Sequence, residues 1–199
     1  NTNFSKWKDK INQLKLKLDI KVKTKEEMDK INNFNSHQNA ILVTEPLHRL
    51  SMDEFLSDKS SYDKMPMRLI LLDEVTDPQN VGAIIRSALA FKMDGLALSQ
   101  RNSPQETSVL SKASSGALDK LKIIELSNMS REIKKLQRVN FSIFGLANEG
   151  EKDIYELENE TGDVALILGS EGKGLRRLTK ENVDYLIKIP INQEADSLN

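Results

Sequence analysis

Residues 69–90 read LILLDEVTDPQNVGAIIRSALA, and this stretch decides the fold. It opens with the apolar run Leu69–Leu72, passes through a polar segment from Asp73 to Asn80, and then changes to helical spacing. Asp77-Pro78 is typical of the start of a helix, because proline fits the first helical turn. The apolar positions after it share one helical stripe: Val81, Ile84, Ile85, Ala88 and Leu89. The stretch therefore predicts a buried strand that leads through a short loop into an amphipathic helix.

The same alternation continues to the end of the chain. Strand-like runs recur, and helical patterns lie between most of them. Strands that alternate with helices are typical of a parallel sheet with helices on both faces. We therefore expect an α/β fold with a mostly parallel sheet, whose strands are Leu69–Leu72, Leu96–Leu98, Ile123–Leu126, Phe141–Leu146, Val164–Leu168 and Tyr185–Ile189.

The residues before this region have a different pattern. Apolar residues at helical spacing predict an amphipathic helix over residues 4–18. Asp19–Val22 has the composition of a short strand, and Asn39–Glu45 that of a second strand, which Pro46 ends. Thr24 with Glu27 has the spacing of a capping box, so a helix should run from there to about Asn32.

A polar, turn-rich segment at residues 57–66 has the composition of a linker. It predicts a boundary between an N-terminal domain, residues 1–62, and a larger domain, residues 67–199. The first residue is Asn rather than Met, so we expect the natural start of the protein to lie before it.

Composition excludes several classes of protein. The chain has 199 residues, of which 38% are hydrophobic and 30% charged, which is enough for a packed core. It has no cysteine, which excludes disulfides and thiol catalysis and fits a cytoplasmic location. Its two histidines are too few for a His-rich metal centre, so we expect no metal. Apolar runs of about five residues, such as Val164–Leu168, are too short to span a membrane.

Charge is distributed unevenly along the chain. Residues 6–30 carry nine lysines and five acids, whereas residues 149–163 carry seven acids and one lysine. A basic segment can bind phosphates of a nucleic acid. The same lysines can equally form the solvated face of a helix, and charge alone favours this plainer interpretation.

Unusual residues follow the strands, where parallel sheets bind ligands. Strand 164–168 leads into Gly169-Ser170-Glu171-Gly172-Lys173-Gly174, which matches neither the phosphate loop of nucleotide hydrolases nor the dinucleotide-binding fingerprint. A glycine turn is more often a tight connection, but a carboxylate such as Glu171 inside one is less common. Arg86 lies one helical turn after Gly82, so the small residue is expected to leave room beside the guanidinium. Arg86 is then either a surface arginine or a group that binds a ligand. Asn80 alone would be a turn or capping residue.

Taken together, these segments resemble the SpoU branch of the SPOUT superfamily, which comprises S-adenosylmethionine-dependent RNA ribose 2′-O-methyltransferases. Leu72–Ala88 resembles the first motif of that branch, and Ile167–Leu175 resembles the second. Ile189-Pro190-Ile191, followed by Ser197-Leu198-Asn199, resembles the beginning of the third. The resemblance covers residues 67–199.

Three further segments are most similar to the bacterial 23S ribosomal RNA guanosine-2′-O-methyltransferase group: Ser36-His37-Gln38, Arg101–Pro104 and Lys112–Ala117. The resemblance implies a SPOUT fold with a C-terminal trefoil knot. It also implies a small α/β RNA-binding domain with a ribosomal-protein-like fold before it, whose first strand would precede this chain. The group continues past Ser-Leu-Asn with a final helix, whereas this chain stops at Asn199.

The resemblance also assigns roles to particular residues. Arg86 would help to activate the ribose 2′-hydroxyl, while Asn80 and Glu171 order the catalytic end of the site. Ser197 and Asn199 would flank the same site. S-adenosylmethionine would bind, without a metal, at the positions that match family cofactor contacts, which are Gly169, Ile189 and Leu198. The implied partners are large-subunit ribosomal RNA and a second copy of the chain, since these enzymes usually form homodimers.

Two alternatives remain at this point. The substrate could be transfer RNA, although the segment Ser36-His37-Gln38 argues against it. The chain could also be an RNA-binding relative without catalysis, a possibility raised by the stop at Asn199. The presence of Asn80, Arg86 and Glu171 argues against this second alternative.

Overall fold

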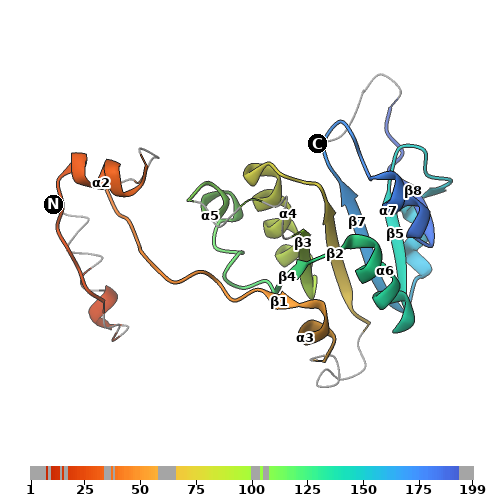
Figure 1. Cartoon of the computed structure of the whole chain (residues 1–199), viewed down its shortest axis with the longest axis horizontal. Helices are drawn as coiled ribbons and strands as arrows, with labels where there is room; N and C mark the ends of the chain where they lie inside the picture. The colour runs from red at the N-terminus through yellow and green to blue at the C-terminus, as the bar shows by residue number, and fades with distance from the viewer. Residues whose placement is uncertain are drawn as a thin grey trace. The chain divides into compact units, whose positions relative to one another are not determined.

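The computed structural model divides the chain into two compact units, Asn1–Glu45 and Pro46–Asn199. It describes residues 8, 10–13, 15, 18–33, 37, 39–57, 66–99, 104 and 108–192. The first unit is drawn in red and orange in Figure 1, and the second continues to the blue end of the colour bar.

In the first unit, the predicted capping box and its helix are confirmed. Helix α2 (Lys25–Ile31) begins at Thr24, whose side chain accepts a hydrogen bond from the backbone N–H of Glu27. The Glu27 carboxylate accepts in return from the backbone N–H of Thr24 at 2.9 Å. The pKa of Glu27 is lowered, first by its hydrogen bond to Lys23. The capping box therefore gives hydrogen-bond acceptors to two backbone N–H groups at the start of the helix, those of Thr24 and Glu27.

The two strands predicted in this unit are wrong. Residues 18–24 and 40–45 have no regular secondary structure, and Val22, Leu42 and Val43 expose 83%, 73% and 82% of their surface. A strand is stable only when a neighbouring strand takes its hydrogen bonds, and within the described residues of this unit there is no such neighbour. Lys10–Gln13 is helical, as predicted, while most of the expected helix over residues 4–18 lies outside the described residues.

The second unit is built on a sheet of eight strands in the order β1-β4-β3-β2-β7-β5-β8-β6, and every neighbouring pair is parallel. All six predicted strands are confirmed: β2 (Arg68–Asp73), β3 (Gly95–Ser99), β4 (Ile123–Leu126), β5 (Phe141–Leu146), β7 (Asp163–Gly169) and β8 (Tyr185–Lys188). Two strands of two residues each, β1 (Leu50–Ser51) and β6 (Lys152–Asp153), were not predicted.

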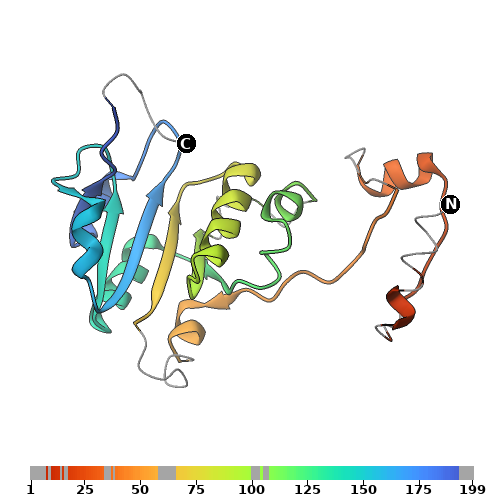
Figure 2. The same cartoon turned by 180° about the vertical axis from the view of Figure 1, so that it is seen from behind.

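Helices cover both faces of the sheet, as the pattern predicted. Along β2, Leu69 and Leu71 belong to one buried cluster, while Ile70 and Leu72 belong to the other. The first cluster packs against α3 (Met52–Ser57) and α6 (Met129–Arg138), and α7 (Arg177–Asn182) lies beside α6. The second packs against α4 (Pro78–Ala90) and α5 (Ser108–Ser114). Figures 1 and 2 show α4 and α6 on opposite sides of β2 from front and back.

The boundary between the units lies earlier in the chain than predicted. Met52 and Phe55 of α3 are buried in the core of the sheet, so α3 belongs to the second unit. The division therefore falls between Glu45 and Pro46, and not within residues 57–66. The polar segment comes after α3, a helix that is already packed on the sheet. Residues 58–65 of this segment lie outside the described part of the chain.

Residues 193–199 lie outside the described part of the chain, so the trefoil knot that the terminal segment would complete stays a prediction. The ribosomal-protein-like fold of the first unit also stays a prediction. Within the described residues, none of the helices has the length and apolar character needed to cross a membrane.

Candidate functional site

The first motif and the glycine loop start side by side at one edge of the sheet. Strands β2 and β7 are neighbours, and Asp73 at the end of β2 is level with Gly169 at the end of β7. The chain then runs from Asp73 to α4 on one side, and from Gly169 into residues 170–174 on the other. This edge, beyond the carboxyl ends of parallel strands, is the usual place for a ligand in such sheets.

Asn80 and Glu171 meet across these two segments. Asp77 caps α4, accepting a hydrogen bond from the backbone N–H of Gln79 at 3.0 Å. This cap places Asn80 in the first helical turn, where its side-chain Nδ2 donates a hydrogen bond to Oε2 of Glu171 at 3.2 Å. Glu171 is exposed and Asn80 is half-buried, so the pair faces solvent at the edge of the sheet.

Arg86 is exposed on α4 and is not part of this pair. It lies six residues after Asn80, so it is displaced by roughly 9 Å along the helix and about 120° around it. Among the described residues, the Arg86 side chain makes no hydrogen bond or ion pair. It is therefore an exposed cation on the same helix as Asn80 but on a different face.

Gly82 is explained by helix packing. A Cβ at Gly82 would collide with Cβ of Ala113 and would lie 2.9 Å from the backbone N of Ser114, both on α5. The sequence interpretation, in which this glycine leaves room beside the Arg86 guanidinium, is wrong for this structure. The space beside Gly82 is filled by α5.

The glycine loop is a closed turn. The backbone N–H of Gly174 donates to the carbonyl of Ser170 at 2.8 Å, and the N–H of Ser170 donates back to the carbonyl of Gly174 at 3.2 Å. Gly172 and Gly174 have φ angles of +78° and +64°, which glycine adopts without strain. Glu171 is thus presented from a short, internally hydrogen-bonded turn rather than from a long loop.

Gly169 is required by the loop itself. A Cβ at this position would collide with the backbone of Gly174 and Leu175, where the loop returns toward the sheet. The resemblance interpreted Gly169 as a cofactor contact. In this structure the close approach that excludes a side chain is made by the loop's own backbone.

The remaining predicted cofactor positions lie near the end of the chain. Ile189 follows β8 and exposes 37% of its surface. In the sheet, β5 lies between β7 and β8, so the glycine loop and Ile189 flank the end of β5. Among the described residues, nothing lies within 4 Å of the Cβ positions of Gly172 and Gly174, so the described part of the chain leaves the outer side of the loop open. Leu198, Ser197 and Asn199 lie outside the described residues.

The exposed main chain of the loop and the apolar side chain of Ile189 suit a ligand that is held by backbone and apolar contacts. They fit the nucleoside cofactor expected from the sequence better than they fit a metal. Within the described residues, there is no group of three His, Cys, Asp or Glu side chains that could hold a metal ion.

Sequence reasoning missed an ion pair at the base of the site. Asp73 is fully buried, and its carboxylate is bound by Arg176, at the start of α7. The available signal was the position of Asp73 at the end of an apolar strand, because a buried carboxylate requires a partner. The sequence could not show that this partner lies 103 residues later.

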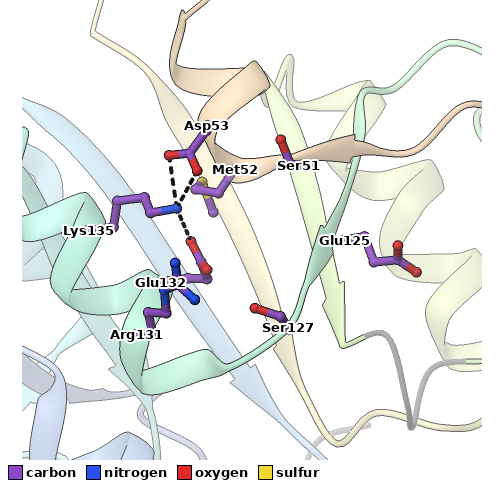
Figure 3. A pocket seen from close by; sticks show the side chains of 8 residues that line it. All are labelled: Ser51, Met52, Asp53, Glu125, Ser127, Arg131, Glu132 and Lys135. Atoms are coloured by element: carbon purple, nitrogen blue, oxygen red, sulfur yellow. Dashed lines mark hydrogen bonds and ion pairs between the residues drawn. The ribbon is translucent and has the colours of Figure 1, made fainter.

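A polar pocket lies away from this site, between α3, the end of β4 and the start of α6 (Figure 3). Its volume is about 240 Å³. Lys135 Nζ lies 2.9 Å from an oxygen of Asp53 and 3.0 Å from Oε2 of the buried Glu132. The pKa of Lys135 is raised, first by the hydrogen bond to Asp53 and then by Glu132. Because Lys135 on α6 pairs with Asp53 on α3 as well as with Glu132, we interpret the cluster as the contact that fastens α3 to α6.

Comparison with known proteins gives a consistent result. Residues 67–199 match the model of the SpoU rRNA Methylase family. A Mycobacterium leprae protein named as an uncharacterized tRNA/rRNA methyltransferase is 34% identical over 86% of this chain and 55% of its own length. Proteins named 23S rRNA (guanosine-2′-O-)-methyltransferase RlmB are 43% identical in Xylella fastidiosa, over 66% of this chain and 52% of that protein, and 38% identical in Coxiella burnetii, over 87% and 68%.

Solved structures agree. The SpoU methyltransferase AviRb from Streptomyces viridochromogenes, in complex with the cofactor AdoMet, has a TM-score of 0.62 and is 25% identical, covering 69% of this chain and 54% of its own. An AdoMet-bound rRNA methyltransferase from Sinorhizobium meliloti has a TM-score of 0.61 at 25% identity, covering 69% and 52%. This chain spans about half the length of the first curated relatives that it matches.

Proposed function

Because this chain belongs to the SpoU rRNA Methylase family, we propose that it transfers the methyl group of S-adenosylmethionine to a ribose 2′-hydroxyl of RNA. The observation that carries this proposal is the hydrogen bond between Asn80 and Glu171. These residues come from two motifs that are 91 positions apart, and the fold brings them together at the ligand-binding edge of the sheet.

Arg86 is the residue that we propose to act on the hydroxyl. Arginine stays protonated in water, so it is a poor general base. Its exposed guanidinium can instead bind the ribose oxygen or the adjacent phosphate and stabilise the alkoxide that develops as the hydroxyl proton passes to solvent water.

When bound, S-adenosylmethionine supplies a methyl group activated by its sulfonium. We propose that the open side of the glycine loop, at Gly172 and Gly174, and the exposed side chain of Ile189 hold it. Leu198 is expected to complete this set. Glu171 keeps the loop joined to α4 through Asn80.

Large-subunit ribosomal RNA is the substrate that we favour, with a guanosine as the methylated nucleotide. The support is the identity of 43% and 38% to proteins named 23S rRNA (guanosine-2′-O-)-methyltransferase RlmB. Transfer RNA is the second candidate, since the mycobacterial relatives are named tRNA/rRNA methyltransferases. The first unit, with its lysine-rich segment 6–30, is proposed to bind RNA. A homodimer in the cytoplasm is proposed as the working form.

The test is methyl transfer from radiolabelled S-adenosylmethionine to purified 23S ribosomal RNA and, separately, to bulk transfer RNA. The labelled RNA is digested to nucleosides and the product is identified by chromatography. The proposal expects label in 2′-O-methylguanosine from the ribosomal RNA. Label in transfer RNA alone would move the substrate to the second candidate, and label on a base would contradict the proposed reaction.

A further inference from the structure

Asp73 carries a buried charge whose two oxygens are both bound by one residue. Its Oδ2 accepts a hydrogen bond from the backbone N–H of Arg176 at 2.9 Å. Its Oδ1 accepts from the guanidinium Nε of Arg176 at 2.7 Å. None of the Asp73 side chain is exposed, whereas 49% of the Arg176 side chain is. A charge at this depth is tolerated only with such close partners.

This pair fixes the glycine loop at its base. Asp73 is level with Gly169, where the loop begins, and Arg176 follows buried Leu175, where the loop ends. Arg176 also forms a second ion pair, in which its Nη1 lies 3.1 Å from Oε1 of Glu74. Both limbs of the loop are therefore fastened to the end of β2.

Two links thus join the first motif to the glycine loop. The inner link is the buried pair of Asp73 and Arg176, and the outer link is the hydrogen bond from Asn80 to Glu171. The outer link joins an exposed carboxylate to a neutral amide, and a contact of this kind is weak by itself in water. The position of Glu171 therefore depends on how the base of the loop is held.

We propose that Asp73 and Arg176 are positioning residues for methyl transfer, which hold the glycine loop so that Glu171 meets Asn80. The inference rests on the proposed function, because it assigns the pair a role in that reaction. A displacement of a catalytic loop by about 1 Å can lower turnover on the order of 100-fold. A pair that only stabilised the fold would lower the melting temperature without changing turnover by the folded protein.

The variant Arg176→Gln tests this role. It removes the guanidinium contacts but keeps the backbone N–H that Asp73 accepts, and its half-exposed site favours folding. The matched control is Arg177→Gln at the next position, whose guanidinium pairs with Glu181 on α7 at 2.6 Å. We expect kcat on RNA to fall at least about tenfold in Arg176→Gln, with KM nearly unchanged, and to stay near normal in the control. Arg176→Lys should restore only part of the loss, since an ammonium lacks the guanidinium fork.

A double variant asks whether the pair acts through Glu171. If it does, Arg176→Gln combined with Glu171→Ala should lose about as much turnover as Glu171→Ala alone, because the two changes disable one unit. Losses that multiply would overturn the proposal. So would normal turnover in Arg176→Gln.

A second readout needs no methyl transfer. Lys173 is exposed at the tip of the loop, so a lysine-specific protease reports how often the loop opens, and its recognition is unaffected by changes at the two arginines. We expect cleavage after Lys173 to be several times faster in Arg176→Gln than in Arg177→Gln. Equal rates would overturn the proposal. If the unaltered chain methylates no RNA while the cleavage rates differ as expected, the proposed function fails and the pair's hold on the loop stands.

Discussion

At the scale of single residues, the buried carboxylate of Glu132 is paired with a charge of opposite sign. Glu132 exposes 5% of its surface, and its carboxylate relies on Lys135, which also reaches the exposed Asp53 (Figure 3). Removing Lys135 would leave a buried carboxylate without a counter-charge, which is far more costly than losing a surface ion pair. This contact is consequently a sensitive place to test how α3 is held.

We predict that Lys135→Ala lowers the free energy of unfolding by about 2 kcal/mol. The neighbouring Lys134 is exposed, so Lys134→Ala should change it by less than about 0.5 kcal/mol. Urea unfolding followed by circular dichroism measures both. A loss in Lys135→Ala as small as in the control would show that α3 is fastened by apolar packing alone.

The pH dependence of this loss follows from the raised pKa of Lys135. A lysine whose folded pKa is raised contributes its full stabilisation below the unfolded pKa, and loses it only as pH rises through the higher folded value. The difference between wild type and Lys135→Ala should therefore be the same at about pH 7 and about pH 9. A difference that shrinks between these values would contradict the assignment.

At the scale of elements, the contact of α4 with α5 depends on one missing side chain. Gly82 of α4 lies directly against Ala113 and Ser114 of α5. We predict that Gly82→Ala destabilises the protein by about 1–3 kcal/mol, because a methyl group there forces the two helices apart. Ala83→Ser, on the exposed side of the same helix, should cost less than about 0.5 kcal/mol. Unchanged or higher stability in Gly82→Ala would show that α5 can shift without cost.

The sequence predicted the elements whose signal is local and repeated. The stripe of α4 repeats at helical spacing, and the six longer strands are short runs of mostly apolar residues, so both signals are visible without knowing their neighbours. The two-residue strands β1 and β6 have no period to detect. Asn39–Glu45 has strand composition but remains irregular, because strand formation depends on a partner elsewhere in the chain.

The candidate site was predictable to the same extent. Asn80 and Glu171 were expected together because the family resemblance assigns both to the catalytic end of the site, and each follows a strand of the parallel sheet. The pairing of Asp73 with Arg176 could not be predicted, since the sequence around either residue does not indicate which distant residue it contacts. Gly82 was singled out as special for the wrong reason, whereas the cofactor contact expected at Gly169 stays a prediction. Their constraints come from α5 and from the returning loop.

At the scale of the whole molecule, the position of the boundary decides how the units can be separated. A cut near residue 60 would remove Met52 and Phe55 from the core of the second unit, whereas a cut after Glu45 leaves it whole. We predict that removing residues 1–45 weakens binding to ribosomal RNA at least about tenfold and makes it less dependent on salt, because the lysines at 6–30 are lost.

Fluorescence anisotropy at two salt concentrations measures this effect, with S-adenosylmethionine affinity as the control that should not change. An RNA affinity equal to that of the full chain would mean that these lysines form only a solvated helix face.

The proposal that α4 and the glycine loop form one methyl-transfer site depends most directly on Arg86. The decisive measurement is single-turnover methylation of a 23S ribosomal RNA fragment by Arg86→Ala, with cofactor binding measured on the same sample by calorimetry. We predict that turnover falls by about 100-fold or more, the effect of losing one charged donor to a developing alkoxide, while S-adenosylmethionine affinity changes little. Near-normal turnover in Arg86→Ala would contradict the account and leave Arg86 as an ordinary surface arginine.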